Sequence, residues 1–426
     1  MGLLFLFKKE QQKDIIIINT LNMYTIILRF LFLVLHFPLI IPRKYRNWLY
    51  EQKKISKKLK ENKQKSIWLH CASLGEYEHI KVLIPELKKI NKLITITFFS
   101  NSGYENFRDH HLIRQVLYLP VDFKSNMNRF IELINPMMVI VSKNDVWPNM
   151  ATCIKNKEIP FYLVGAKLKK SKMNSFLHRV YYHKYFSKFS YIFCQDQLTY
   201  DFLKNRKIAP CVKISDLRIA QVVKDKQKLF VDKKIETFIK NKKTVIYGSV
   251  EKNDYDIIIN TINKRTDVQH IIIPHDINKH ELNKLQSKLK AKHILYSNIH
   301  DSDTIDSNIL IVDIFGILKK IYKYCEIAYI GGGFDQGVHN TLEPAIYENL
   351  ILFGPYHTHF PETFFLIEKN VATVVNNKME FEQTLNQLLY EYQEKKQNIS
   401  KTISSFFKEN IHNTDFVINT IKQDIM

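Results

Sequence analysis

Short apolar runs alternate with longer stretches of helical spacing from Ser66 onward. In the first half the runs are IWLH (67–70), LITITFF (93–99), VLYL (116–119), MMVIV (137–141), FYLV (161–164) and YIFC (191–194). In the second half they are TVIYG (244–248), HIIIP (270–274), ILIVD (309–313), EIAYIGG (326–332) and LILFG (350–354). Continuous apolar strands separated by helices are typical of parallel sheets covered on both faces. The sequence therefore predicts an α/β fold.

The alternation pauses over residues 224–243, a charged stretch rich in Lys and Asp. A chain of 426 residues is also too long for one ordinary domain. We therefore expect a Rossmann-like domain over residues 51–223, a linker over 224–243 and a second Rossmann-like domain over 244–426. In such sheets ligands bind at the carboxyl ends of the strands, so a cleft between the two domains is expected.

The segment before the first sheet is predicted to bind a membrane. Residues 24–41 are almost entirely apolar, and a basic flank follows them at Arg43, Lys44, Arg46, Lys53 and Lys54. Such a run is long enough to enter a bilayer, and its flank would stay with anionic headgroups on the cytoplasmic side. We therefore assign residues 1–50 to an anchor and its basic flank, with a buried amphipathic helix as the alternative. Whether Met1 or Met23 is the first residue stays open.

The net charge of +21 permits an anionic partner but does not choose one. The excess is scattered Lys rather than one Arg-rich stripe, which favours a solvated surface and argues against nucleic-acid binding. The five cysteines are far apart and include no Cys-x-x-Cys pair, so a reducing compartment fits best. The paired histidines, His110 with His111 and His357 with His359, lack further ligands at zinc spacing. We expect no metal site.

The sequence HCASLGE (70–76) follows the first strand and opens a helix near Glu76 that we expect to continue towards Ile90. A carboxylate in the first turn of a helix is stabilised by the helix dipole, which would keep Glu76 ionised and able to accept a proton. A helix-capping role without chemistry is the alternative.

A glycine-rich segment, GGGFDQGVHNTLEP (331–344), follows a strand and opens a helix near Thr341. Glycines let backbone amides approach an anion, and Glu343 can accept hydrogen bonds from two ribose hydroxyls. Two further loops, at 274–276 and 315–317, fall at strand ends in the same half. Each of these two loops alone would be an ordinary turn.

Seven segments together resemble one family. They are HCASLGE, TFFSNSGYE (97–105), DVWPN (145–149), YGS (247–249), IIPHD (272–276), IGGGFDQGVHNTLEPA (330–345) and LFGPYHTHFPE (352–362). In order and spacing they are similar to the transferases of 3-deoxy-D-manno-octulosonic acid (Kdo) in Gram-negative lipopolysaccharide synthesis. The resemblance implies a GT-B fold, an amino-terminal anchor at the cytoplasmic face of the inner membrane and a reaction without a metal or other cofactor. It also implies a lipid A precursor as acceptor on the amino-terminal domain and CMP-Kdo as donor on the other.

The resemblance also assigns roles to residues. It places the general base on Glu76 and the cation that stabilises the departing phosphate on Arg218, where many relatives have Lys. It places the contacts to CMP on Pro274, His275, Phe315, Gly316, Ile317, Asn340, Thr341, Leu342 and Glu343. An inverting transfer of Kdo to a lipid A precursor is the expected activity.

The chain departs from the family at two places. Many relatives carry two acids before Trp-Pro-Asn, whereas this chain has Lys143 and the shorter Asp145. Residues 165–170 also lack the Asn-Ala-Arg pattern of relatives, so contacts to the acceptor can differ there. Two alternative functions stay open: a GT-B transferase that uses a UDP-sugar, and a non-catalytic basic protein at the membrane surface.

Overall fold

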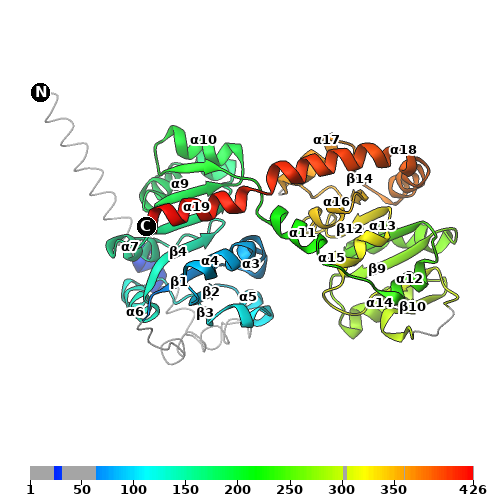
Figure 1. Cartoon of the computed structure of the whole chain (residues 1–426), viewed down its shortest axis with the longest axis horizontal. Helices are drawn as coiled ribbons and strands as arrows, with labels where there is room; N and C mark the ends of the chain where they lie inside the picture. Colours follow the sequence, from blue (N-terminus) through cyan, green and yellow to red (C-terminus); the bar gives the residue numbers. More distant parts are fainter. Residues whose placement is uncertain (1–23, 31–63, 301–304, 359, 426) are drawn as a thin grey trace, which may run out of the picture. The chain divides into compact units, whose positions relative to one another are not determined.

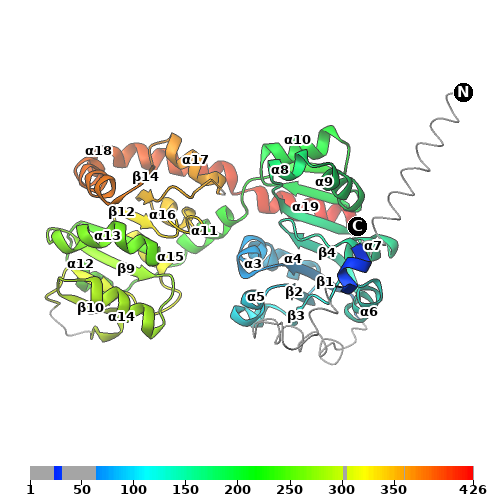
Figure 2. The same ribbon diagram turned by 180° about the vertical axis from the view of Figure 1, so that it is seen from behind.

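The computed structural model describes residues 24–30, 64–300, 305–358 and 360–425. It divides the chain into two compact units, which Figures 1 and 2 show from opposite sides. Unit 1 consists of residues 1–218 and 413–426, and unit 2 consists of residues 219–412. Each unit is built around its own parallel sheet.

Unit 1 contains a seven-stranded sheet in the order β3-β2-β1-β4-β5-β6-β7. Every pairing in it is parallel. The strands are β1 (Ser66–Cys71), β2 (Ile94–Phe98), β3 (Gln115–Tyr118), β4 (Pro136–Ser142), β5 (Phe161–Ala166), β6 (Tyr191–Cys194) and β7 (Cys211–Lys213). All residues of β1, β2 and β5 are buried, as their continuous apolar sequences predict.

Helices connect these strands and complete the unit. They are α3 (Leu74–Ile80), α4 (Ile84–Ile90), α5 (Asn101–Asn106), α6 (Lys124–Ile134), α7 (Pro148–Asn156), α8 (Lys170–Asn174), α9 (Phe176–Tyr181) and α10 (Gln197–Asn205). Short 3-10 helices lie at Lys81–Leu83 and His110–Leu112, and a π-helical turn at Tyr182–Phe186. The single helix predicted towards Ile90 is thus interrupted before α4, where Pro85 occupies the first turn.

Unit 2 repeats this plan with the strand order β10-β11-β9-β8-β12-β13-β14, again entirely parallel. Its strands are β8 (Thr244–Val250), β9 (Gln269–Pro274), β10 (His293–Leu295), β11 (Ile309–Ile311), β12 (Ile327–Ile330), β13 (Leu350–Phe353) and β14 (Ala372–Val374). Its helices are α11 (Arg218–Lys226), α12 (Lys233–Ile239), α13 (Lys252–Lys264), α14 (Lys279–Lys288), α15 (Leu318–Ile321), α16 (Leu342–Ile346), α17 (Pro361–Glu368) and α18 (Lys378–Asn410). Two 3-10 turns, Tyr296–Asn298 and Tyr322–Tyr324, complete the list.

The final helix, α19 (Asn413–Ile425), belongs to unit 1 and is the red helix beside its sheet in Figure 1. The Tyr162 hydroxyl of β5 donates to Asp424 at 3.2 Å, and Phe193 of β6 packs edge-on against Phe416. The predicted division at residues 224–243 therefore differs from the structure. The chain passes between the units at Arg218 and returns after His412, because α11 and α12 bury apolar faces against the core of unit 2.

The predicted anchor falls largely outside the described residues. Within it, residues 24–30 form a helix beside α6 and α7, drawn in blue in Figure 2. The Tyr24 hydroxyl donates to Asp122 at 2.9 Å, and Asp122 also accepts from the first amides of α7. Among the residues that the structure describes, no helix is both long and apolar enough to cross a membrane.

Candidate active site

The polar residues of unit 1 gather where β1, β4, β6 and β7 end. Glu76 follows β1, Lys143 and Asp145 follow β4, Gln195 follows β6, and Asp216 follows β7. Because all these strands are parallel, their carboxyl ends lie at the same edge of the sheet. The topology thus brings together the predicted base, Lys143 and Asp145 before Trp-Pro-Asn, and the segment that carries Arg218.

Glu76 lies in the first turn of α3, and its Oε2 accepts the backbone N–H of Ala72 at 2.6 Å. Burial raises the pKa of the Glu76 carboxyl to about 7, and the charge of Asp145 adds to this effect. The hydrogen bond from Ala72 and the charges of His70 and Lys143 act in the opposite direction. The expectation that the helix dipole keeps Glu76 fully ionised is therefore corrected, because desolvation outweighs it. A carboxyl that titrates near neutral pH is well suited to accept and release a proton.

A hydrogen-bonded chain fixes Asp145 beside this carboxyl. Trp68 Nε1 donates to the Thr97 hydroxyl at 2.9 Å, and Thr97 lies 2.8 Å from His70 Nδ1. His70 Nε2 lies 2.8 Å from Asp145 Oδ2. If the Thr97 hydroxyl donates to Nδ1, the imidazole proton sits on Nε2 and faces Asp145. Although burial raises the pKa of Asp145, the hydrogen bond and charge of His70 outweigh burial and lower it.

A second chain links Lys143 to Arg218. Lys143 Nζ donates to the side-chain oxygen of Gln195, whose Nε2 donates to Asp216 Oδ2 at 2.6 Å. Arg218 binds the same carboxylate through Nε at 3.1 Å and Nη2 at 2.8 Å, the bidentate geometry that fixes a guanidinium. Although burial raises the pKa of Asp216, the charge of Arg218 holds it well below its usual range. The buried Asp216 therefore positions the predicted cation.

His79 is a buried member of this site that the sequence analysis missed. It lies on α3 three residues after Glu76, with its Nε2 3.6 Å from Asp216 Oδ1. Burial lowers the pKa of His79 to about 3, so the ring is neutral at pH 7. Its ring packs against Gly165, where a Cβ atom would lie only 2.3 Å from the imidazole and φ is +78°. The i, i+3 spacing along α3 puts His79 on the same helix face as Glu76. Its burial could not be predicted, because it depends on contact with Gly165 of β5.

In unit 2 the residues predicted to contact CMP lie on loops at one sheet edge. Pro274 ends β9 and His275 follows it, Phe315 to Ile317 follow β11, and Asn340 to Glu343 lead into α16. Strands β11, β9, β8 and β12 are neighbours in the sheet, so these loops share its carboxyl edge. Phe315 is exposed, Leu342 and Thr341 are buried, and the Asn340 side chain accepts a hydrogen bond from the amide of Leu342 at 3.1 Å.

Three backbone amides of the glycine segment donate hydrogen bonds within unit 2. The amide of Gly331 donates to Gly248 at 2.9 Å, that of Gly332 to Asp254 at 3.0 Å, and that of Gly337 to Gly332 at 3.0 Å. A Cβ atom on Gly331 would lie 2.2 Å from the Ser249 carbonyl oxygen. These glycines therefore allow close backbone packing, and the three amides named have acceptors within the protein.

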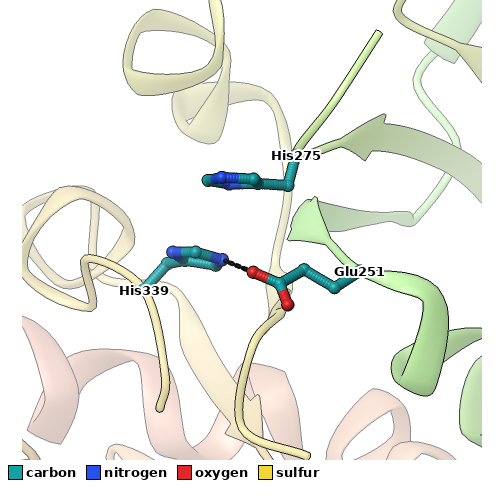
Figure 3. A group of neighbouring side chains, drawn as sticks. All are labelled: Glu251, His275 and His339. Carbon is teal, nitrogen blue, oxygen red and sulfur yellow. Dashed lines mark hydrogen bonds and ion pairs between the residues drawn. The ribbon is translucent and has the colours of Figure 1, made fainter. Parts of the chain in front are cut away.

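Glu251, His275 and His339 form a cluster at this edge, shown in Figure 3. Their potential ligand atoms lie within 4.8 Å of one another, and His339 Nε2 lies 2.9 Å from Glu251 Oε1. The two imidazoles are stacked, with centroids 4.5 Å apart and planes inclined by 9°. The lone pair of an imidazole nitrogen lies in the plane of its ring. In two parallel, stacked rings these lone pairs do not converge on one point, so both rings could bind the same ion only if one of them turned. The expectation that the site uses no metal stays a prediction.

Protonation of the cluster follows from its surroundings. Burial, with the charge of His275, lowers the pKa of His339 to about 4. Burial, with a hydrogen bond to Asp335, raises the pKa of Glu251 to about 7. At neutral pH the site therefore presents a neutral His339 and a Glu251 that is partly protonated. The sequence analysis missed Glu251 because it lies far from the glycine segment in the chain.

Glu343 lies in the first turn of α16 and borders a small cavity within unit 2. Lys319 and Tyr347 line the same cavity. The Lys319 ammonium pairs with Asp225 at 2.8 Å. Glu343 is thus half-buried beside polar partners, a setting that suits a carboxylate acceptor for hydroxyl groups.

Solved structures share this architecture. The UDP-GlcNAc 2-epimerase from Neisseria meningitidis aligns over 84% of this chain and all of its own, with a TM-score of 0.57 and 14% identity. A glycosyltransferase from Rickettsia africae aligns over 85% of this chain and 99% of its own, with a TM-score of 0.55 and 13% identity. At these identities the likeness shows the fold alone: two parallel-sheet α/β domains like those of GT-B glycosyltransferases.

Sequence comparisons are more specific. A bifunctional glycosyltransferase/methyltransferase of Fusobacterium nucleatum is 24% identical over 89% of this chain, which spans only 63% of that protein. A 3-deoxy-D-manno-octulosonic acid transferase of Aquifex aeolicus is 26% identical over 77% of this chain and 87% of its own. The corresponding Rickettsia typhi transferase is 25% identical over 76% of this chain and 72% of its own. Residues 47–220 match the 3-deoxy-D-manno-octulosonic-acid transferase family. The predicted resemblance to the Kdo transferases is confirmed by these matches.

Proposed function

We propose that the protein transfers Kdo from CMP-Kdo to a lipid A precursor, with inversion at the anomeric carbon. The observation that carries this proposal is Glu76, a half-buried carboxyl at the edge of the unit 1 sheet with a pKa raised to about 7 by burial. Its neighbours Asp145 and His70 are held by hydrogen bonds, so the carboxyl has a fixed polar environment.

In the proposed step a glucosamine hydroxyl of the acceptor attacks the anomeric carbon of Kdo. The new carbon–oxygen bond forms as the bond to the CMP phosphate breaks, and CMP leaves with the electron pair. Ionised Glu76 takes the hydroxyl proton, which makes the attacking oxygen a stronger nucleophile. Attack on the face opposite to the departing phosphate inverts the anomeric centre. The proposed reaction step includes no metal, because CMP is already a good leaving group.

Arg218 is assigned to the departing phosphate. A guanidinium suits this role because it stays charged and can bind phosphate oxygens in pairs. Asp216 would keep it oriented before the donor arrives. Pro274, His275, Phe315 to Ile317 and Asn340 to Glu343 are the proposed CMP contacts, with Glu343 on the ribose hydroxyls.

The lipid acceptor explains why a membrane partner is expected. We propose that residues 24–41 and the basic flank hold the protein on anionic lipids at the cytoplasmic face of the inner membrane. Confinement to the surface that contains the acceptor raises its effective concentration. The net charge of +21 would favour the same location.

The test is incubation of the purified chain with CMP-Kdo and a tetra-acylated lipid A precursor, followed by mass spectrometry of the lipid. A mass increase of one or more Kdo residues is expected, and it also counts the sugars added. Transfer from a UDP-sugar in parallel reactions, with none from CMP-Kdo, would favour the alternative GT-B activity. Absence of any transfer, with intact binding to anionic vesicles, would favour a non-catalytic surface protein.

A further inference from the structure

A cavity of about 430 Å³ opens beside the proposed acceptor site in unit 1. Six apolar and aromatic side chains form much of its wall: Trp147, Pro148, Phe176, Leu177, Val180 and Tyr181. Asp145 also lines it, and the same carboxylate accepts the hydrogen bond of His70 and raises the pKa of Glu76. The cavity is therefore continuous with the edge where the sugar hydroxyl of the acceptor would react.

The mouth of this cavity exposes apolar surface that water solvates poorly. Phe176 is 66% exposed and Leu177 is 72% exposed on α9. Tyr24 reaches the cavity from the helix of residues 24–30, on which Ile26 and Phe30 are also exposed. Exposed apolar side chains at the mouth of a cavity are typical of a binding surface for an apolar partner or a membrane. The run that we predict to enter a membrane begins at Tyr24, on the same wall.

Charge selects the kind of apolar ligand. Lys184 lines the cavity, and burial together with the charge of Lys188 lowers its pKa. A cavity lined by apolar side chains, an ammonium group and a hydrogen-bonded carboxylate suits an amphipathic molecule. A phosphorylated glycolipid is such a molecule, because it combines an acyl chain, an anionic phosphate and sugar hydroxyl groups.

We propose that this cavity binds one acyl chain of the lipid acceptor, with the sugar hydroxyl directed to Glu76 and Asp145. This inference rests on the proposed function in one respect, which is that the acceptor is a lipid. It adds the chemical class of the subsite and its position between α7 and α9. Each methylene buried in the cavity should strengthen binding about fourfold, so acceptor affinity depends steeply on acylation.

A quenching experiment tests chain binding without any activity assay. Trp147 lines the cavity, whereas Trp68 is buried in the core and Trp48 can be replaced by Phe. A dibrominated fatty acid is titrated into the full-length Trp48→Phe chain at constant detergent, because bromine quenches indole fluorescence on contact. Saturable quenching is expected, and its loss in Leu177→Asp would place the acyl chain of the fatty acid in the cavity. Quenching that is absent, or unsaturable at all concentrations, overturns the proposal.

The matched control is Leu198→Asp, which introduces the same charge at an exposed leucine of α10 outside the cavity lining. Leu177→Asp should lower the affinity for the fatty acid tenfold or more, and Leu198→Asp should lower it less than twofold. Equal weakening by both would show a nonspecific surface effect and refute the cavity assignment. Circular dichroism and CMP affinity of both variants should match the parent.

A kinetic comparison separates the subsite from the proposed function. The acceptor is offered as the tetra-acylated lipid and as its fully deacylated form. Leu177→Asp should raise KM for the acylated acceptor about tenfold and leave KM for the deacylated form within twofold. If Leu177→Asp transfers to both acceptors as the parent does, although the fatty acid quenches Trp147 in the parent, the cavity holds other membrane lipids. That result would refute its role in acceptor binding. Quenching without transfer by the parent chain to either acceptor would instead refute the proposed function.

Discussion

Replacing Glu76 by Gln tests both the base and the cause of its raised pKa. Gln keeps the size of the side chain, and its amide oxygen can still accept the N–H of Ala72. It cannot take a proton from a hydroxyl group. Transfer should therefore fall about 10²–10⁴-fold, the usual contribution of a positioned acid or base. In the parent enzyme, kcat/KM should rise with pH through about 7 as Glu76 ionises, and this limb should disappear from the residual activity of Glu76→Gln.

The stability of the parent protein should fall with rising pH, whereas its kcat/KM should rise. Burial raises the pKa of Glu76 from 4.5 to about 7, so the folded state binds a proton more tightly than the unfolded chain does. Below pH 4.5 this carboxyl is neutral in both states, and its favourable contribution is complete. As pH rises towards 7 the unfolded chain releases the proton first, and the folded state loses up to about 3 kcal/mol. Partial solvent access makes this an upper bound.

Glu76→Gln should consequently be more stable than the parent above pH 7, by no more than about 3 kcal/mol, and equally stable near pH 4. Urea denaturation at the two pH values, with steady-state transfer measured on the same samples, gives both quantities. Asp145→Asn is the comparison, because it removes the neighbouring charge that raises the pKa of Glu76. If Asp145→Asn abolishes transfer while Glu76→Gln keeps most of it, the assignment of the base is wrong. If the stability difference has the same size at both pH values, burial of the ionised carboxylate is not its cause.

Three further predictions concern the rest of the site. Asp216→Asn should lower transfer and destabilise the protein by about 3–5 kcal/mol in urea, since it leaves Arg218 without its buried carboxylate; unchanged stability would refute the positioning role. Glu343→Ala should weaken CMP by about 1–3 kcal/mol in calorimetry if Glu343 binds ribose hydroxyls, and equal affinities would exclude that contact. Dialysis against EDTA should leave transfer unchanged, whereas a loss that zinc restores would indicate a metal at the cluster of His275 and His339.

The strands that the sequence predicts include every inner strand of the two sheets and one edge strand, β3. All eleven predicted runs coincide with β1 to β6, β8, β9 and β11 to β13 within two residues at each end, because each is apolar on both faces. The strands β7, β10 and β14 were missed. Each has three residues and lies at a sheet edge, where pairing with a single neighbour decides its conformation. The strand β11 also has three residues, but it is an inner strand and lies within the apolar run 309–313.

In the candidate site, too, local features could be predicted from the sequence and long-range contacts could not. Glu76 could be predicted because its motif is local and follows a strand end. Its raised pKa could not, since it comes from burial and from Asp145, which is distant in sequence. The same reason explains Gln195, which the sequence analysis did not single out although it joins Lys143 to Asp216. Contacts between loops that follow different strands depend on strand order, and strand order is a property of the folded sheet.

The departure at Lys143 has a consistent physical explanation once these contacts are considered. In many relatives an acid occupies this position, whereas here a cation joins the chain through Gln195 to Asp216. The charge of Lys143 lowers the pKa of Glu76 and that of Asp216, so it partly offsets the effect of burial on both carboxyls. Asp145 is then the acid that remains beside Glu76, and the hydrogen bond of His70 keeps it ionised. The hydrogen bond from Ala72 and the charges of His70 and Lys143 thus oppose the effects of burial and of Asp145, which leaves the pKa of Glu76 at about 7.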